Sequence, residues 1–197
     1  MEKTARSPRL RDVQRTKTKE HLLLSAARLF GEAGFAETTI HDIAEASGAS
    51  RATIYSHFES KNAILTEIAQ LMWGKAEILY DAFGDLRDWN RDTIGAWLNS
   101  VLDEWESSSW LLRVESVRDH NYDEVYLDFH LRFVVALTKN GALWARFGDE
   151  EPRDRALFLI SGLELFLNTW IVRGWPTCRG SVLGTLTDVW CSVLKVA

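Results

Sequence analysis

The sequence predicts an all-α protein, and three observations support this expectation. Across the 197 residues, no stretch shows the sustained two-residue alternation of β-branched side chains that marks a half-buried strand. Apolar residues recur instead at helical spacing, and the three prolines, Pro8, Pro152 and Pro176, stand at expected boundaries between helical segments. A hydrophobic content of 46% is sufficient for a substantial core.

A first helix is expected over residues 18–33. Leu22, Ala26 and Phe30 share one helical face, and Gly34 is suited to end the helix. The segment before it, ARSPRLRDVQRTKTK, is polar and basic, and we expect it to form an arm that precedes the helix.

Two short helices are expected next, because caps and a glycine follow one another closely. Thr39 is a suitable N-cap for the first of them, with Asp42 three residues later as in a weak capping box. Gly48 permits a sharp turn, Ser50 can cap the second, and Ser60 can cap a fourth helix beyond it. Two short helices joined by a glycine-containing turn, with a third that closes their core, form the helix-turn-helix arrangement.

The remainder of the chain also has helical periodicity. Further helices are expected at about 62–84, 91–106, 109–118, 121–147, 153–174 and 179–196, which with the first three makes nine. We therefore expect two parts: residues 1–62, with the arm and the helix-turn-helix, and residues 63–197, a larger helical domain.

The distribution of charge agrees with this division. The net charge is −5, but residues 1–62 carry ten Lys and Arg against eight Asp and Glu, whereas residues 63–197 carry 13 against 20. Residues 1–19 alone hold seven basic and two acidic side chains. This asymmetry predicts that only the N-terminal end meets an anionic partner.

Nothing in the sequence indicates an enzyme, a metal site or a membrane segment. The longest uninterrupted apolar runs have five residues, far short of the roughly 18 that span a bilayer, and the first twenty residues lack the apolar segment of a secretory signal. Cys178 and Cys191 fit neither a disulfide framework nor a metal knuckle. His120, Glu124 and Asp128 share a helical face, but a metal site needs further convergent ligands. We expect a cytoplasmic protein without catalytic residues, metal or cofactor.

Residues 26–65, AARLFGEAGFAETTIHDIAEASGASRATIYSHFESKNAIL, resemble the DNA-binding domain of the tetracycline-repressor (TetR) family over its full length. The most specific parts are LF...GF..TT and IA..SG.S..TIY.HF.SK. The resemblance covers about the first third of the chain. Members of this family are dimeric, all-helical transcription regulators, usually repressors, whose C-terminal domain binds a small molecule and thereby alters operator affinity. The resemblance thus implies three partners: double-stranded DNA, a second copy of the chain and an effector.

The resemblance also implies roles for individual head residues. It places the base-facing start of the recognition helix at Ser50, Arg51, Ala52 and Thr53, and phosphate contacts at Thr39, Tyr55, His57 and Lys61. Arg51 is expected to bind guanine, since a guanidinium can bond O6 and N7 together; the alternative is a solvated surface arginine. His41 is expected at a base or a phosphate. The basic arm is expected either to enter the minor groove or to form a solvated tail.

Aromatic side chains in the middle of the chain predict an aromatic-walled cavity for a small ligand. The predicted lining residues are Trp97, Val101, Trp105, Tyr126, Phe129, Phe133 and Asn168. For each aromatic residue the alternative is a place in the core. Glu104 and Glu164 are polar groups within apolar helices, and an acidic lining with aromatic walls suits a lipophilic cation.

The last two predicted helices are apolar over much of their circumference, so each must bury more than one side. In the TetR family the corresponding pair forms a four-helix bundle across the dimer axis. The predicted interface residues are Leu163, Leu167, Trp170, Leu186 and Trp190. The alternative is that both helices are core of a monomer.

These expectations describe a homodimeric transcription regulator, usually a repressor, that binds a palindromic operator. It releases the operator when a small, aromatic or largely apolar effector enters the C-terminal domain. The alternative is a DNA-binding or nucleoid factor of the same fold that has no ligand and acts through a protein partner. An enzyme on a helical scaffold is a further rival, but it lacks a catalytic constellation.

Overall fold

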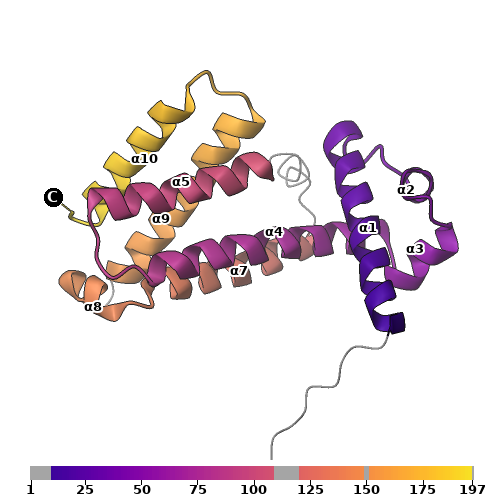
Figure 1. Ribbon diagram of the computed structural model, residues 1–197, viewed down its shortest axis with the longest axis horizontal. Helices are drawn as coiled ribbons and strands as arrows, with labels where there is room; N and C mark the ends of the chain where they lie inside the picture. The colour runs from indigo at the N-terminus through magenta and orange to yellow at the C-terminus, as the bar shows by residue number, and fades with distance from the viewer. Residues whose placement is uncertain (1–9, 109–119, 149–150, 197) are drawn as a thin grey trace, which may run out of the picture. The chain divides into compact units, whose positions relative to one another are not determined.

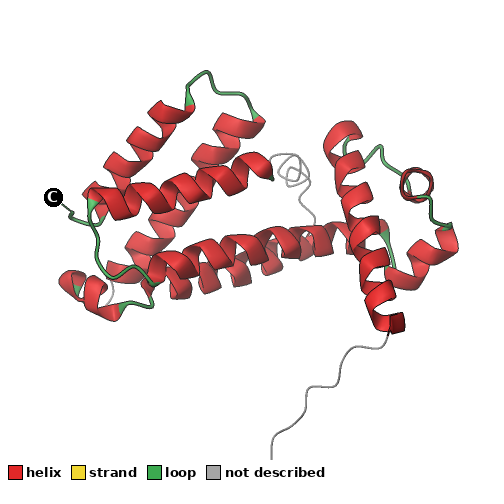
Figure 2. Ribbon diagram, in the orientation of Figure 1, coloured by secondary structure: helices red, strands yellow, loops and turns green. Residues whose placement is uncertain are grey.

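The computed structural model describes the backbone of residues 10–108, 120–148 and 151–196, and their side chains except those of residues 120–126. Within these ranges the secondary structure is helical, without a strand, as predicted (Figure 2). The helix expected at 109–118 lies outside the described residues.

The chain divides into two compact units. We call Met1–Ala69 the head and Gln70–Ala197 the body. The expected division after residue 62 and the observed one both fall inside helix α4, Lys61–Gly84. Each unit is described by itself.

The head contains helices α1 (Leu10–Ala33), α2 (Ile40–Ser47), α3 (Arg51–His57) and the first part of α4 (Figure 1). Its core is formed by side chains that are at most 1% exposed: Leu22, Ala26, Phe30, Ile43, Ile54 and Ile64. Burial of each large apolar side chain stabilises the fold by roughly 1.5–3 kcal/mol. The apolar face expected for the first helix, with Leu22, Ala26 and Phe30, is therefore the buried one.

Helix α1 is longer than expected, because it begins at Leu10 and includes most of the basic arm. Five of the eight added residues, 10–17, are Leu, Arg, Gln or Lys, which favour helices, and the hydroxyls of Thr16 and Thr18 donate hydrogen bonds to carbonyls four residues earlier. An α-helix is about 10–12 Å wide, whereas the minor groove of DNA is about 6 Å wide. Contact of residues 10–19 with the minor groove thus stays a prediction, and it requires these residues to leave the helix.

The body contains five further α-helices within the described ranges, with a 3₁₀ turn (Ala145–Phe147) and a π turn (Asn168–Val172) between them. The helices are α5 (Arg91–Ser107), α7 (His120–Thr138), α8 (Gly141–Trp144), α9 (Glu151–Leu167) and α10 (Arg179–Val193). Helix α10 packs mainly on α5, and α7 packs mainly on α9.

Aromatic side chains form the centre of the body. The ring of Phe83 lies 4.9 Å from that of Trp97 and 5.4 Å from that of Trp190, and the two tryptophan rings are 4.7 Å apart. Tilted and edge-on pairs of this kind contribute roughly 0.5–1.5 kcal/mol each beyond their buried area. The indole Nε1 of Trp97 donates to the carbonyl of Leu79 at 2.7 Å, which satisfies its polar group inside the core.

One predicted helix is corrected by the structure. The segment 121–147 is not continuous, because α7 and α8 are separated at Lys139 and Asn140. The Lys139 ammonium bonds to two aspartates near the end of α4, at 2.7 and 2.8 Å, and the Asn140 amide donates to the carbonyl of Leu86 at 2.9 Å. These contacts accompany the end of the helix, after which Trp144 lies buried with its indole bonded to the last turn of α7.

Helices α4 and α7 lie close together at Gly84. A Cβ atom at this position would lie 2.2 Å from the carbonyl oxygen of Ala136 and 2.7 Å from Cγ of Lys139. Gly74, ten residues earlier in the same helix, has no atom within 4 Å of such a Cβ. The packing of α4 on α7 therefore requires glycine at one of these positions and not at the other.

We expect Gly84→Ala to lower the free energy of unfolding by roughly 1–3 kcal/mol, because the backbone of α7 must move to admit the methyl group. Gly74→Ala should leave stability unchanged or raise it by about 0.5–1 kcal/mol through helix propensity. Urea unfolding followed by circular dichroism measures both. Equal effects of the two substitutions would contradict the close packing at Gly84.

Candidate nucleic-acid interface and ligand pocket

Helix α2 is fixed by the capping box that the sequence predicts. The hydroxyl of Thr39 accepts the Asp42 backbone N–H at 3.2 Å, while the Asp42 carboxylate accepts the backbone N–H and the hydroxyl of Thr39 at 2.7 and 2.8 Å. The hydrogen bond from the Thr39 backbone N–H, and to a lesser extent that from its hydroxyl, hold the pKa of Asp42 below its ordinary value of 3.8. The helix ends at Gly48 in the left-handed conformation, with φ 65°, where glycine is unstrained. Helix α2 is thus capped at both ends, and Gly48 begins the turn into α3.

Helix α3 begins with Ser50 as its N-cap. The Ser50 hydroxyl accepts the Thr53 backbone N–H at 3.0 Å and lies 2.8 Å from the Thr53 hydroxyl, so the polar groups of these two residues bond to each other. Of the four predicted base-facing residues, Arg51 and Ala52 remain exposed without such a bond. The Arg51 guanidinium makes no hydrogen bond or ion pair with any residue that the structure describes. Its donors are available to a ligand.

The predicted flanking residues differ in their availability. Tyr55 is 50% exposed and His41 is exposed, so both can reach an approaching partner. His57 is half-buried, with its ring centroid 6.1 Å from that of Phe58. Thr39 is exposed, but its hydroxyl serves the cap of α2.

Lys61 occupies a position that its predicted role does not explain. Its ammonium donates to the carbonyls of Phe35, Thr38 and Ala36, at 2.6, 2.8 and 3.4 Å, and lies 4.3 Å from the ring centroid of Phe35. All three N–H donors of the ammonium are therefore engaged by the turn between α1 and α2. Phosphate contact by Lys61 stays a prediction, and it requires the ammonium to leave these carbonyls.

Other basic residues of the head are better placed to meet an anion. Arg11, Arg15 and Lys17 are exposed and, among the described residues, have no ion-pair partner. Lys19 differs, because its ammonium pairs with Glu67 at 2.5 Å. The extension of α1 thus carries unpaired positive charge, which attracts phosphate without sequence preference.

We expect Lys61→Met to act on the fold of the head. The variant should lower the free energy of unfolding by roughly 1–3 kcal/mol, as for loss of hydrogen bonds to a charged group. The slope of log DNA affinity against log salt should stay unchanged, since no phosphate contact is removed. Lys17→Met is the matched control and should leave stability unchanged. A shallower slope with normal stability for Lys61→Met would restore the phosphate role.

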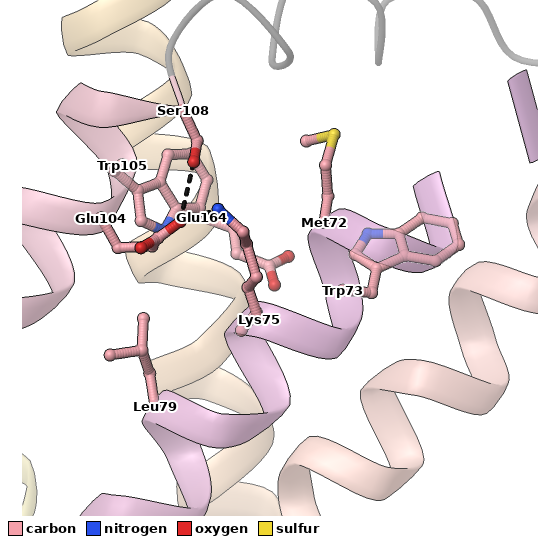
Figure 3. Close-up of a pocket in the computed structure, with 9 residues that line it drawn as sticks. Met72, Trp73, Lys75, Leu79, Glu104, Trp105, Ser108 and Glu164 are labelled. Atoms are coloured by element: carbon pink, nitrogen blue, oxygen red, sulfur yellow. Dashed lines mark hydrogen bonds and ion pairs between the residues drawn. The ribbon is translucent and has the colours of Figure 1, made fainter. Parts of the chain in front are cut away.

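The body contains a pocket between α4, α5 and α9 (Figure 3). The space between its walls amounts to about 510 Å³, a volume that includes open solvent at the mouth. Its described lining residues are Met72, Trp73, Lys75, Ala76, Leu79, Glu104, Trp105, Ser108 and Glu164.

Two hydrogen-bonded groups of charged side chains line this pocket. The Lys75 ammonium and the Ser108 hydroxyl each donate to Oε1 of Glu104 at 2.8 Å. Burial raises the pKa of Glu104, but these hydrogen bonds outweigh it and hold the pKa below its ordinary value of 4.5. Glu104 is therefore ionised at neutral pH. On the opposite side, Oε2 of Glu164 lies 2.7 Å from Nε2 of the buried His130.

The structure brings one of the seven predicted ligand residues, Trp105, to this pocket. Trp97, Val101 and Phe133 are buried in the core of the body, and Phe129 is buried behind Trp73, with 5.1 Å between the rings.

The two remaining predicted residues do not extend the described lining. Asn168 lies in the π turn after α9, and the side chain of Tyr126 lies outside the described residues. The lining contributed by α4 was missed, since no sequence signal distinguishes an apolar face that borders a cavity from one that borders a helix.

The predicted dimer-interface positions also need correction. Leu163, Leu167, Leu186 and Trp190 are at most 6% exposed within their own chain, and Trp170 is half-buried with its indole bonded to Thr177. The first four side chains therefore have no surface to offer a partner. The same two helices carry other large apolar side chains that are exposed: Leu157, Phe158, Leu165 and Val189.

The sequence comparisons concern mainly the head. The profile of the family described as bacterial regulatory proteins, tetR family, matches residues 22–68. The chain is similar to the HTH-type transcriptional regulator AcrR of Shigella flexneri, with 38% identity over 68 residues, 33% of this chain and 32% of that protein. It is also similar to the HTH-type transcriptional repressor KstR2 of Rhodococcus jostii, with 40% identity over 67 residues, 34% of this chain and 30% of that protein. The chain spans about a third of the length of these curated relatives.

Solved structures resemble the chain over most of its length. The TetR family transcriptional regulator PfmR from Thermus thermophilus superposes with a TM-score of 0.66 at 21% identity, over 89% of this chain and 97% of that one. The fatty acid degradation regulator FadR from Bacillus halodurans superposes with a TM-score of 0.71 at 13% identity, over 87% of this chain and 93% of that one. At these identities the likeness shows a shared fold.

Proposed function

We propose that this chain, which belongs to the TetR family of bacterial regulatory proteins, is a transcription regulator and not an enzyme. We further propose that it binds a palindromic operator as a dimer. A small molecule in the body controls this binding. The observation that carries the proposal is the exposed start of α3. There a capped helix presents Arg51 beside Ala52, with no protein partner for the guanidinium among the described residues. Short side chains around a free guanidinium suit close approach to base edges in the major groove.

Contacts on either side of α3 supply affinity that does not depend on sequence. His41 and Tyr55 are exposed near the recognition helix, and the extension of α1 adds Arg11, Arg15 and Lys17. Base contacts then decide sequence, while phosphate contacts decide register and salt dependence.

We expect Arg51→Ala to weaken binding to a selected operator by roughly 1–3 kcal/mol per half-site and to relax the preference at one base pair. Arg15→Ala should weaken selected and random DNA alike. The operator is first selected from random duplexes, and competition binding against single-base variants then measures the effect. Equal weakening of selected and random DNA by Arg51→Ala would remove its assignment as a base reader.

We place the dimer surface on the exposed face of α9. Leu157, Phe158 and Leu165 are 47%, 64% and 70% exposed, and the small residues Ser161 and Gly162 lie between them on the same helical face. A contiguous apolar face of this kind marks an interaction site, and small residues allow a second helix to approach closely.

The composition of this helix would also suit a membrane-spanning segment. Among the described residues, 151–172 form one helix long and apolar enough to cross a membrane, and only 28% of that window is buried. A two-fold operator requires two heads about 34–36 Å apart, which favours a second copy of the chain as the partner of this face.

We expect Leu165→Glu to yield a monomer and to abolish tight operator binding, because a charge at the centre of an apolar interface lacks a partner. Ile78→Glu is the matched control: Ile78 is also 70% exposed, but it lies on α4. Sedimentation of both variants, followed by operator titration, makes the comparison. A dimeric Leu165→Glu that binds the operator normally would place the interface elsewhere.

A further inference from the structure

The ligand pocket of the body has an excess of acidic groups that the proposed function leaves unexplained. Its described lining contains two carboxylates, Glu104 and Glu164, and one ammonium, that of Lys75. The ammonium pairs with Glu104, with 2.8 Å between Nζ and Oε1. Glu164 is bonded instead to an imidazole, that of His130, at 2.7 Å.

The acidic groups also lie deeper than the basic one. The side chain of Glu164 is 17% exposed and that of Glu104 is 33% exposed, whereas that of Lys75 is 55% exposed. A carboxylate withdrawn from water costs free energy unless donors or a cation compensate it. Among the described lining residues, the carboxylates are thus less exposed than the ammonium, and this order favours a positively charged ligand.

The remaining walls suit the body of an organic cation. Trp105 contributes an indole ring near Glu104, and Met72 and Leu79 add apolar surface, while the ring of Trp73 is directed away from the carboxylates (Figure 3). The face of an indole attracts a cation through its quadrupole, with about 0.5–2 kcal/mol depending on desolvation. An aromatic wall beside carboxylates thus favours a ligand that is both positively charged and apolar.

Lys75 can give up its position at low cost. Its ammonium is carried on a flexible four-carbon stem, and a pair this exposed contributes only about 0–1 kcal/mol. When the ammonium turns outward into water, Glu104 keeps the hydrogen bond from Ser108 at 2.8 Å.

We propose that this pocket binds a lipophilic organic cation, whose charge approaches Glu164 and Glu104, and that Lys75 is the internal cation that the ligand displaces. The inference rests on the proposed function, because it assigns a chemical class to the effector of the same site.

Calorimetric titration of the intact protein with tetraphenylphosphonium and with tetraphenylborate tests the sign of the charge. The two ions have nearly the same size and shape and opposite charges. We expect the phosphonium to bind at least about tenfold more tightly, since the carboxylates attract it and repel the borate. Equal or tighter binding of the borate overturns the inference.

Three substitutions test the assigned residues. Glu164→Gln and Glu104→Gln should each weaken the phosphonium about tenfold, whereas Lys75→Met should strengthen it by removing the internal competitor. For an anion site all three signs are reversed. Glu77→Gln is the control, because Glu77 lies on α4 outside the pocket lining and pairs with Arg132 at 3.4 Å. It should leave the phosphonium affinity unchanged, and an equal loss in this variant overturns the site assignment.

Thermal unfolding verifies that each variant is folded. If Glu164→Gln does not fold, the sign of the Lys75→Met effect decides, since this substitution touches only the exposed pair at the mouth.

A separate titration of operator DNA distinguishes the inference from the function on which it rests. Phosphonium binding with the expected signs, but with unchanged DNA affinity, supports the cation site and contradicts the regulatory link. Release of DNA by uncharged compounds, with no phosphonium binding, supports the regulatory link and overturns the cation site.

Discussion

One ammonium group holds together the part of the head on which its recognition surface depends. The side chain of Lys61 leaves the start of α4 and exchanges water for three carbonyl oxygens of the turn between α1 and α2. That turn ends at Thr39, which caps α2, and α2 leads through Gly48 into α3. The direction in which Arg51 is presented therefore depends on a chain of local constraints that begins with Lys61. A positive charge that stabilises the fold is not free to neutralise a phosphate at the same time.

In the body, the same residue types serve two separate purposes. The tryptophans and phenylalanines at the centre pack against one another, with ring centroids 4.7–5.4 Å apart. The pocket lies beside this core, where the aromatic surface is interrupted by Lys75, Glu104 and Glu164. The packed aromatic core supports one side of the pocket, because interiors packed at native density resist deformation.

Features that depend on residues close together in the sequence could be predicted, whereas features that depend on residues far apart could not. Thr39 and Ser50 were recognised as caps because their partners lie three residues away, so the evidence is contained in a short segment. The break at Asn140 is accompanied by a hydrogen bond to the carbonyl of Leu86, 54 residues earlier, although the dipeptide Asn140-Gly141 is itself a local turn signal. The extension of α1 was also underestimated, since a polar helix without an apolar face has no periodicity to detect.

Residues on one face of a helix are identified by periodicity, but the neighbour of that face is not. Leu163 and Trp190 were correctly recognised as needing burial, yet the partner that buries them is their own chain. The same limit applies to the ligand residues, where Trp97 and Trp105 share a helical face and only Trp105 reaches the pocket. Periodicity therefore indicates which face of a helix is buried, while tertiary packing decides which element covers that face.

The division into head and body also separates the chromophores of the molecule. All nine tryptophans follow Ala69, so the intrinsic near-ultraviolet emission of the protein originates in the body, while the head contributes a single tyrosine, Tyr55. Trp73 and Trp105 border the pocket, and Trp97 and Trp190 are shielded in the core. Events confined to the head are thus nearly silent in tryptophan emission. A shift in the wavelength of that emission when DNA is added is therefore a label-free signal from the body and not from the head.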